Sequence, residues 1–223
     1  MTTYLLLLLL SFVLCYCFGS IIFGVIISKI TSGVDVRKQG SGNAGATNVM
    51  RTVGVGAAIA TFLCDSLKCA AAVLICKYLI LIPASAGAEL PELLKIEYMT
   101  YLLGFFAMLG HSYPLFFNFK GGKAVSSAIG VLFCINWQIA LFVLLIFIVC
   151  VVLTRIVSLG SVLGAVQFIV LSFVYSAGNP PLIRLYITAL SMLIGGLVIL
   201  RHKDNIKRLL AGEETAMKPK SGG

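Results

Sequence analysis

The chain has 223 residues, of which 60% are hydrophobic and only 11% are charged, and its formal net charge is +9. A water-soluble surface needs many more charged side chains, so the mean hydropathy of +1.05 excludes a soluble domain as well as a disordered or collagen-like chain. No basic stretch is interleaved with exposed aromatic residues, which argues against binding of nucleic acid. The chain is therefore expected to be an integral membrane protein whose partner is the lipid bilayer.

The apolar residues form runs separated by segments in which glycine, proline or charge collects. A helix that crosses a bilayer needs about 20 apolar residues. We therefore expect an all-α polytopic bundle that forms a single membrane-embedded domain over residues 1–223, with residues 215–223 as a flexible tail. The first run lacks a basic segment before it and is expected to be an uncleaved span rather than a secretion signal. The runs cover residues 4–28, 53–83, 98–118, 124–153, 157–176 and 182–200.

Positive charge is concentrated in alternate connections between the runs. Lysine and arginine gather in residues 29–52 and 119–123, at Arg155 and in the tail from residue 201, whereas residues 84–97 hold three glutamates and one lysine. Basic connections are retained on the cytoplasmic side of a membrane, so the first group is expected to face the cytoplasm. This places the N-terminus outside and the C-terminus inside the cell.

The run at residues 124–153 begins after Lys123 and ends before Arg155, both of which are predicted to be cytoplasmic. It should therefore cross the membrane an even number of times, as a hairpin that turns at the polar and interfacial residues 136–138. Two arms of about 14 residues reach only ~21 Å each, which is short of the ~30 Å hydrocarbon core. Counting the hairpin as two helices gives about seven transmembrane helices, and a re-entrant hairpin gives five spans with the same sidedness.

The cysteines all lie within apolar runs, where cysteine behaves as a small buried hydrophobic residue. None has histidine partners at the spacing of a metal site, so we expect no metal, no redox pair and no cofactor. The cysteines are Cys15, Cys17, Cys64, Cys69, Cys76, Cys134 and Cys150.

Two charged residues, Asp65 and Lys68, stand inside the second run with a spacing that puts them on one face of a helix. Charges within a span usually mark a transport pathway or a functional site. A structural ion pair that ties helices together is the alternative, and the sequence leaves both interpretations open.

The segment QGSGNAGATNVMRTVG, residues 39–54, is far richer in glycine and small polar residues than a simple connection needs. Its glycines match G-x-G-x-x-G, but no strand precedes them, so a dinucleotide-binding fold is not supported. Glycines still allow successive backbone N–H groups to approach one anion. Thr47 and Asn48 are hydrogen-bond donors or helix caps there, and Arg51 follows one turn later. The alternative is a flexible capped loop.

The segment GHSYPLFFNFKGGKAVSS, residues 110–127, delivers two lysines and two glycines, residues 120–123, to the start of the next apolar run. This arrangement suits a phosphate at a helix N-terminus, although it is no Walker A loop. Anchoring of the lysines at the cytoplasmic surface explains them equally well. His111 lies in a mostly apolar stretch, where a hydrogen-bonded structural histidine is the alternative to a functional one.

The segment LRHKDNIKRLLAGEE, residues 200–214, places His202, Asn205 and Arg208 about one helical turn apart. A cationic tail that binds anionic headgroups is the simpler interpretation of its charges. Three polar, phosphate-compatible segments nevertheless face the same side, and the turn at residues 158–165 adds the hydroxyls of Ser158 and Ser161. Their convergence on an anion-binding site is the hypothesis that accounts for all of them.

These segments closely resemble the cytoplasmic motifs of the bacterial PlsY family, the acyl-phosphate:glycerol-3-phosphate acyltransferases, in sequence, order and sidedness over residues 1–214. The resemblance implies a multi-pass protein of the bacterial inner membrane, with five or seven spans and an active site that faces the cytoplasm. It implies transfer of a fatty acyl group from acyl phosphate to glycerol 3-phosphate. The product would be lysophosphatidate, the first intermediate of phospholipid synthesis. We expect a monomer without a cofactor.

Motif positions carry the expected roles over to this sequence. The expected catalytic residues are His111, Lys123, His202 and Asn205. The expected substrate-binding residues are Ser41, Asn43, Gly45, Thr47, Asn48, Arg51, Lys120, Gly121, Gly122, Ser161 and Arg208. Glu214 also matches the third motif. One departure is Cys69, which stands where the family commonly has glycine and puts a requirement for very close helix packing in doubt.

An acyl phosphate is already activated, so direct attack by the glycerol hydroxyl needs no covalent nucleophile. The sequence accordingly lacks G-x-S-x-G, has no cysteine beside a histidine in its polar segments, and lacks a His-x4-Asp pair. We expect Ser41 and Asn48 with backbone amides to hold one phosphoryl group, and Arg51 and Lys123 to hold the other.

We expect a backbone N–H or Asn205 to stabilise the oxyanion, and His111, His202 or the substrate's own phosphate to accept the proton. The sequence does not say which motif grips which phosphate. An anion transporter or channel is the rival function, but it predicts polar residues at mid-depth in several spans and an inverted repeat. The sequence instead concentrates polarity on one side.

Overall fold

The structure, a computed structural model, describes residues 1–217. Within that range the chain consists of helices, helical turns and irregular connections, without a β-strand, so the all-α prediction is confirmed. Lys218 and Lys220, which contributed to the charge argument, and residues 218–223 of the predicted flexible tail lie outside the described residues. The preceding residues of that tail contact the bundle, because the Met217 N–H donates to the Arg155 carbonyl at 2.6 Å.

Seven of the helices form the bundle, and shorter ones flank it. The bundle helices are α1 (Thr2–Gly19), α4 (Val55–Ile75), α6 (Ile96–Ser112), α7 (Val125–Ile135), α8 (Trp137–Thr154), α9 (Val157–Tyr175) and α10 (Pro181–Arg201). The shorter helices are α2 (Phe23–Ser32), α3 (Ala46–Thr52), α5 (Ile82–Ser85) and α11 (Lys203–Leu210), with a π-helical segment at Cys76–Leu81 and 3-10 turns at Val36–Lys38, Glu92–Leu94, Leu115–Phe117 and Ser176–Gly178.

Five stretches are long and apolar enough to cross a membrane. Helix α6, with 17 residues, and helix α7, with 11, are shorter. The count of seven crossings therefore stays a prediction. The five stretches are Thr2–Ser32, Val55–Ser85, Trp137–Thr154, Val157–Gly178 and Pro181–Arg201.

The predicted hairpin breaks where its polar residues stand. Helix α7 ends at Ile135, and the Asn136 side chain caps α8 by accepting hydrogen bonds at 3.0 Å from the N–H groups of Gln138 and Ile139. The expectation of two arms of equal length was wrong. At 1.5 Å per residue, α7 is about 16 Å long and α8 is about 27 Å long. Helix α7 packs against α4, α6 and α8, so this short helix is surrounded by other helices.

The first apolar run, expected as one span over residues 4–28, is broken. Helix α1 ends at Gly19 and α2 begins at Phe23, with Ile22 in an extended conformation between them. The Val25 N–H donates to Ile22, and the Ile21 carbonyl instead accepts a hydrogen bond from the Lys68 ammonium of α4. A backbone acceptor that the break removes from the helix is therefore satisfied by a buried charge.

Helices α1 and α6 pack closely because glycine faces backbone at two positions. A Cβ at Gly19 would overlap the Ala107 carbonyl, and one at Gly110 would overlap the Tyr16 carbonyl. Helices α4 and α7 approach in the same way, since a Cβ at Gly130 would overlap the Ser66 carbonyl.

Cys69, which replaces the glycine of the resembling family, is fully buried on α4 with its Sγ 3.8 Å from the Ala107 carbonyl of α6. A thiol is small enough for this contact. The close approach of α4 to a neighbouring helix is made through Gly130 of α7 instead. Cys69 therefore packs against α6 as a small buried side chain, while the close approach at Gly130 belongs to the separate contact of α4 with α7.

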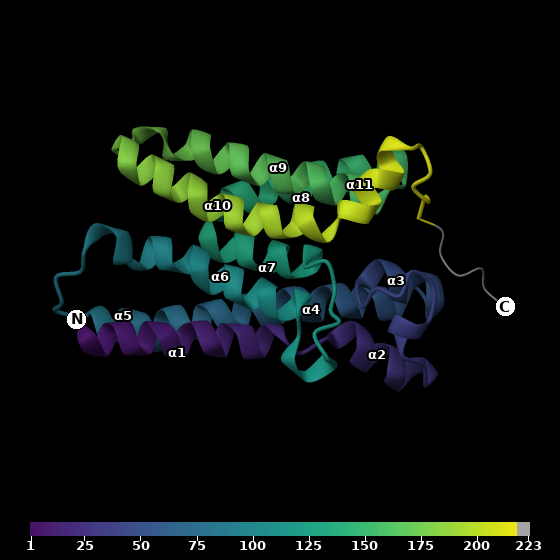
Figure 1. Cartoon of the computed structure of the whole chain (residues 1–223), viewed down its shortest axis with the longest axis horizontal. Coiled ribbons are helices and arrows are strands. Elements are labelled where there is room, and N and C mark those ends of the chain that lie inside the picture. Colours follow the sequence, from purple (N-terminus) through teal and green to yellow (C-terminus); the bar gives the residue numbers. More distant parts are fainter. Residues whose placement is uncertain (218–223) are drawn as a thin grey trace.

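The two ends of the bundle differ in content (Figure 1). The N-terminus, α5 and the connection into α6 lie at one end, and α2, α3 and α11 lie at the other. The basic segments predicted to share one side of the membrane thus gather at one end of the molecule.

We expect Gly110→Ala to lower the free energy of unfolding by about 1–3 kcal/mol, because the added methyl group must displace backbone of α1. Gly196→Ala on α10 is the matched control, since a Cβ there meets no atom within 4 Å. Thermal unfolding of both variants in the same detergent measures the difference. Equal midpoints would contradict the close packing of α1 on α6.

Candidate active site

A cavity of about 860 Å³ opens at the basic end of the bundle. Three segments that lie far apart in the sequence contribute to its lining, residues 40–51, 123–126 and 200–217, and the rest of the lining comes from α4, α8, α9 and His111. The predicted site residues that line it are Ser41, Asn43, Gly45, Thr47, Asn48, Arg51, His111, Lys123, Ser161, His202, Asn205 and Arg208. The convergence expected from the sequence therefore occurs for these residues.

Asn48 organises the glycine-rich segment and is 2% exposed. Its Nδ2 donates to the carbonyls of Val36 at 2.9 Å, Gln39 at 3.0 Å and Asn43 at 2.9 Å, and its Oδ1 accepts from the Ser41 N–H at 2.9 Å. The amide is thus occupied within its own loop. It holds the loop in shape, and the structure leaves it no free donor for the phosphoryl group that the sequence suggested.

The backbone conformation of this segment explains why it contains glycines. Gly40 and Gly42 have φ angles of +57° and +70°, and a Cβ on Gly40 would strike the Asn48 side chain. Ser41 and Thr47 line the cavity, and their hydroxyls have no hydrogen-bond partner within residues 1–217. These hydroxyls are therefore available to a ligand.

The second segment is built around His111. The Gly122 N–H donates to the His111 carbonyl at 3.1 Å, and a Cβ on Gly122 would overlap the His111 ring. A Cβ on Gly121 would overlap the His111 carbonyl and crowd Pro114. Lys120 is exposed, and neither it nor the two glycines line the cavity. The prediction that these three residues form a phosphate grip thus differs from the structure, where the glycines let the loop pack on the histidine.

Lys123 lines the cavity. Its ammonium donates to Asn205 Oδ1, which joins the second segment to the third. Burial lowers the pKa of Lys123 to about 8. The Glu214 carboxylate opposes this shift, and the positive charges of Arg208 and Arg201 add to it.

Glu214 ties the third segment together. Its Oε1 accepts hydrogen bonds from Ser158 Oγ at 2.7 Å and from Asn205 Nδ2 at 2.6 Å, and its Oε2 accepts from Arg208 Nε at 2.7 Å. Burial raises the pKa of this carboxyl, but the three hydrogen bonds outweigh burial and hold the pKa below its usual value. Arg208 is therefore charge-paired, and Asn205 bridges Lys123 and Glu214.

His202 ends helix α10 and is 2% exposed. Its Nδ1 lies 2.8 Å from the Val198 carbonyl, and because a carbonyl can only accept, Nδ1 carries the proton and Nε2 a lone pair. Burial lowers the pKa of His202 to about 4, the Val198 carbonyl opposes this shift, and Lys123 adds to it. The ring is neutral at neutral pH and can accept a proton.

His111 on α6 is also 2% exposed, and its Nδ1 lies 3.0 Å from Lys68 Nζ. Lys68 forms an ion pair with Asp65 at 2.7 Å. The intramembrane charges singled out in the sequence thus contact a residue of the cavity.

Arg201 lines the cavity although it was not predicted as a site residue, and Ser158 and Glu214, which the sequence analysis named without assigning them a role as site residues, line it too. Arg201 donates to the Gly122 carbonyl at 3.2 Å, and its guanidinium lies 4.9 Å from the centre of the Tyr113 ring. In the sequence, the charge of Arg201 was interpreted only as part of the basic tail that anchors the chain on the cytoplasmic side. The match of Glu214 to the third motif was the signal that could have placed it in the site.

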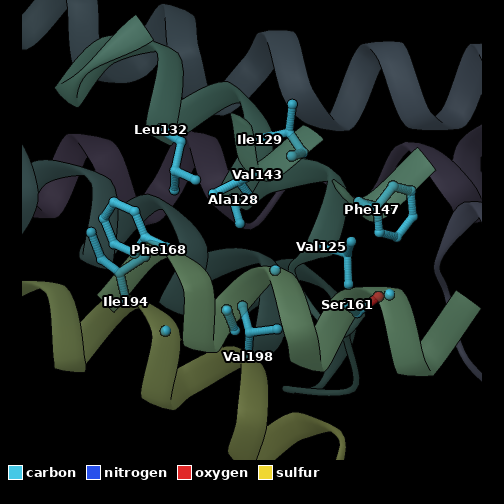
Figure 2. A pocket seen from close by; sticks show the side chains of 14 residues that line it. Val125, Ala128, Ile129, Leu132, Val143, Phe147, Ser161, Phe168, Ile194 and Val198 are labelled. Atoms are coloured by element: carbon cyan, nitrogen blue, oxygen red, sulfur yellow. The ribbon is translucent and has the colours of Figure 1, made fainter. Parts of the chain in front are cut away.

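An apolar groove adjoins the polar cavity between α7, α8, α9 and α10, and the two share Val125, Phe147 and Ser161. Figure 2 shows Phe147 and Ser161 near one end of this groove and Leu132 and Phe168 near the other. The groove has a volume of about 40 Å³, much smaller than that of the polar cavity, and its apolar walls continue from the cavity at Ser161. Within residues 1–217, no group of three or more His, Cys, Asp or Glu side chains is placed to hold a metal ion.

Comparison with known proteins gives matches over nearly the whole chain. The family model described as glycerol-3-phosphate acyltransferase matches residues 9–212. The glycerol-3-phosphate acyltransferase of Prochlorococcus marinus (strain NATL1A) is 39% identical over 200 residues, which cover 89% of this chain and 92% of that protein. The protein of the same description from Thermoanaerobacter sp. (strain X514) is 37% identical over 212 residues, with coverage of 95% and 96%.

Two solved structures of PlsY (YgiH), described as an integral membrane glycerol 3-phosphate acyltransferase, superpose on this chain. The glycerol 3-phosphate form gives a TM-score of 0.77 at 36% identity and covers 95% of this chain and 96% of that one. The lysophosphatidic acid form gives a TM-score of 0.75 at the same identity, with 94% coverage of both chains.

We expect Asn48→Ala to open the loop at residues 36–45, because three carbonyls and one N–H lose their common partner. Amide hydrogen exchange in this loop should quicken at least tenfold while exchange in α4 stays unchanged. Asn179→Ala, which removes a single hydrogen bond to Ser176 at the opposite end of the bundle, is the control. Wild-type exchange in the loop of the Asn48 variant would show that other contacts hold it.

Proposed function

Since the chain belongs to the PlsY family of glycerol-3-phosphate acyltransferases, we propose that it transfers a fatty acyl group from acyl phosphate to the 1-hydroxyl of glycerol 3-phosphate. The products are lysophosphatidate and inorganic phosphate. The observation that carries this proposal is one cavity in which Arg51 and Lys123, from distant segments, meet beside an apolar groove.

Two anionic substrates require cations that no carboxylate of the protein neutralises. Arg208 is paired with Glu214, whereas Arg51 and Lys123 form no salt bridge within the described part of the chain. Arg51 donates to the Thr215 carbonyl at 3.4 Å, and Lys123 donates to an amide oxygen, so neither side chain is bonded to a carboxylate. We assign the phosphate grips to these two residues, with the hydroxyls of Ser41 and Thr47 beside them.

The reaction is a direct acyl transfer. The oxygen of the 1-hydroxyl bonds to the acyl carbonyl carbon, the bond between that carbon and the phosphate oxygen breaks, and the hydroxyl proton ends on the departing phosphate. The lone pair on His202 Nε2 supports a role as the relay for this proton. No cysteine is among the residues described around the cavity, which fits the absence of an acyl-enzyme. We attribute the acceleration of the reaction to the positioning of the two substrates next to one another.

We assign the acyl chain to the apolar groove because its walls are apolar, and since its volume is about 40 Å³, the surrounding helices must separate to admit the chain. The carbonyl would lie near Ser161, where groove and cavity meet, and the chain would extend toward Leu132 and Phe168. A structural relative is described in a lysophosphatidic acid form, which supports binding of an acylated glycerol phosphate by this fold.

The chain is a multi-pass membrane protein, and we assign it one membrane-embedded domain over residues 1–223 with seven crossings. Its basic end, which carries the cavity, faces the cytoplasm of a bacterium, and the N-terminus lies outside. We take the working unit to be a monomer. Transport of an anion is less well supported, because the Asp65–Lys68 pair contacts His111 of the cavity rather than a path through the bundle.

Purified protein supplied with glycerol 3-phosphate should form lysophosphatidate from acyl phosphate and none from acyl-CoA or acyl carrier protein. Product from either of the latter alone would overturn the assigned donor while leaving the enzyme class intact. Absence of product from all three donors would overturn the proposal.

We expect Arg51→Ala and Lys123→Ala each to lower kcat/KM about 100-fold or more, because each removes a charged grip on a phosphoryl group. Lys38→Ala removes the same charge from an exposed position outside the cavity and should retain wild-type turnover. Initial rates of lysophosphatidate formation measure the difference. Wild-type rates in both cavity variants would remove these residues from the binding of phosphate.

The pKa of about 8 for Lys123 predicts a pH dependence. Lysine is charged below its pKa, so the grip is complete at pH 7, and kcat/KM should fall as the pH rises through about 8. Lys123→Arg keeps its charge over this range, so its lower activity should be flat between roughly pH 7 and 9.5. If Lys123→Arg showed the same fall in kcat/KM at alkaline pH, the fall would be due to the titration of a group other than Lys123.

A further inference from the structure

One wall of the polar cavity is apolar and belongs to the membrane-spanning part of the bundle. Helices α4 and α8 both contribute to it, from stretches that are long and apolar enough to cross a bilayer. These side chains offer no hydrogen bond to a phosphoryl group or to a hydroxyl. The apolar wall consists of Val55, Ile59, Phe62 and Leu63 of α4 and Phe147 and Val151 of α8.

The apolar wall also belongs to the outer surface of the bundle. Ile59 and Leu63 are 55% and 50% exposed, and Leu67, which follows Leu63 by one turn on the same face of α4, is 64% exposed outside the cavity. In a membrane-spanning stretch an outward apolar face of this kind contacts lipid. The residues that line the cavity thus continue the lipid-facing surface of α4, so the cavity opens sideways toward the bilayer.

The apolar wall begins close to a proposed phosphate grip and extends toward the interior of the membrane. Arg51 lies four residues before Val55, which is the first residue of α4. From Val55 to Leu63 the helix rises about 12 Å at 1.5 Å per residue. An amphiphile whose phosphoryl group is held at Arg51 can therefore lay its chain along the wall at the depth of the lipid acyl chains.

A different part of the cavity faces water. Ser41, Lys203 and Asp204 line the cavity and are exposed, and all three stand in the polar segments at the basic end of the bundle. Glycerol 3-phosphate and inorganic phosphate are small anions that stay in water, and this polar opening suits them. The cavity therefore has one polar opening and one apolar opening.

We propose that acyl phosphate enters the cavity from the bilayer between α4 and α8, past Ile59, Leu63 and Val151, and that lysophosphatidate leaves by the same opening. This inference rests on the proposed acyl transfer. A chain that passed through water would expose every CH₂ group, and sideways movement within the membrane avoids that cost. Phe147 lines both the cavity and the apolar groove, so a chain that passes Val151 reaches the groove there.

Helix α7 supports both sides of this opening. It packs against α4 and against α8, and Val125 and Ser126 from its first turn line the cavity. The contact with α4 is close, since a Cβ at Gly130 would overlap the Ser66 carbonyl, one turn beyond the apolar wall. The two helices that border the opening are thus anchored to a third helix behind it.

A bulky side chain on either helix should obstruct the opening. In vesicles, we expect Ile59→Trp and Val151→Trp each to lower kcat/KM for palmitoyl phosphate about tenfold or more and to leave KM for glycerol 3-phosphate within about twofold. Butyryl phosphate has a chain short enough to enter from water, so its kcat/KM should stay at the wild-type value.

The matched controls are Leu67→Trp on α4 and Val152→Trp on α8. Both positions are lipid-facing, with exposed fractions of 64% and 70%, and neither lines the cavity, so both controls should keep wild-type rates with either donor. Wild-type rates with palmitoyl phosphate in both wall variants would overturn the proposal. A fall of equal size with the two donors would overturn it as well, because a distorted cavity affects every donor.

Photocrosslinking tests the opening without turnover. The photoreactive residue benzoylphenylalanine in place of Ile59 should label radioactive lysophosphatidate in vesicles about threefold more than in place of Leu67, relative to bulk phospholipid, because a bound amphiphile stays longer at the opening. Equal labelling at the two positions would overturn the proposal. Failure of the proposed function is distinct, because it appears as a wild-type protein that makes no lysophosphatidate. In that event the crosslinking still decides whether an anionic amphiphile occupies the opening.

Discussion

A single ammonium group inside the bundle joins the parts of the structure on which the cavity depends. Lys68 of α4 donates to the backbone at the α1–α2 break, to Asp65 on its own helix and to His111 of α6. A buried cation that lost one of these acceptors would destabilise the protein, since the remaining charge would be uncompensated. The position of His111 beneath the cavity is thus coupled to the packing of α1, α4 and α6.

The distribution of carboxylates explains where free positive charge remains. Asp65 neutralises Lys68 in the bundle, Asp35 pairs with Arg37 in the first loop, and Glu214 holds Arg208. Arg51 and Lys123 keep their charge because their partners are a carbonyl and an amide oxygen. Positive charge without a carboxylate partner therefore remains at the cavity, where we propose that the phosphorylated substrates bind.

The glycines and asparagines show where residue type alone misleads. Glycine signals close approach of backbone to something, and the sequence cannot say to what: Gly122 approaches the His111 ring rather than a phosphate. Asn48 resembles a free donor in sequence, yet four loop groups occupy its amide. Such assignments depend on contacts between residues that only the folded loop brings together.

The sequence by itself determined the class of protein, the apolar runs, the break at Asn136 and the gathering of basic segments at one end, because hydropathy and charge act locally and are written in residue order. It also named most of the polar residues that line the cavity. Only the tertiary structure decided that the first run breaks before Phe23, that the hairpin arms are unequal and that Lys68 contacts His111. These features depend on hydrogen bonds and packing between distant segments, whose geometry no local pattern specifies.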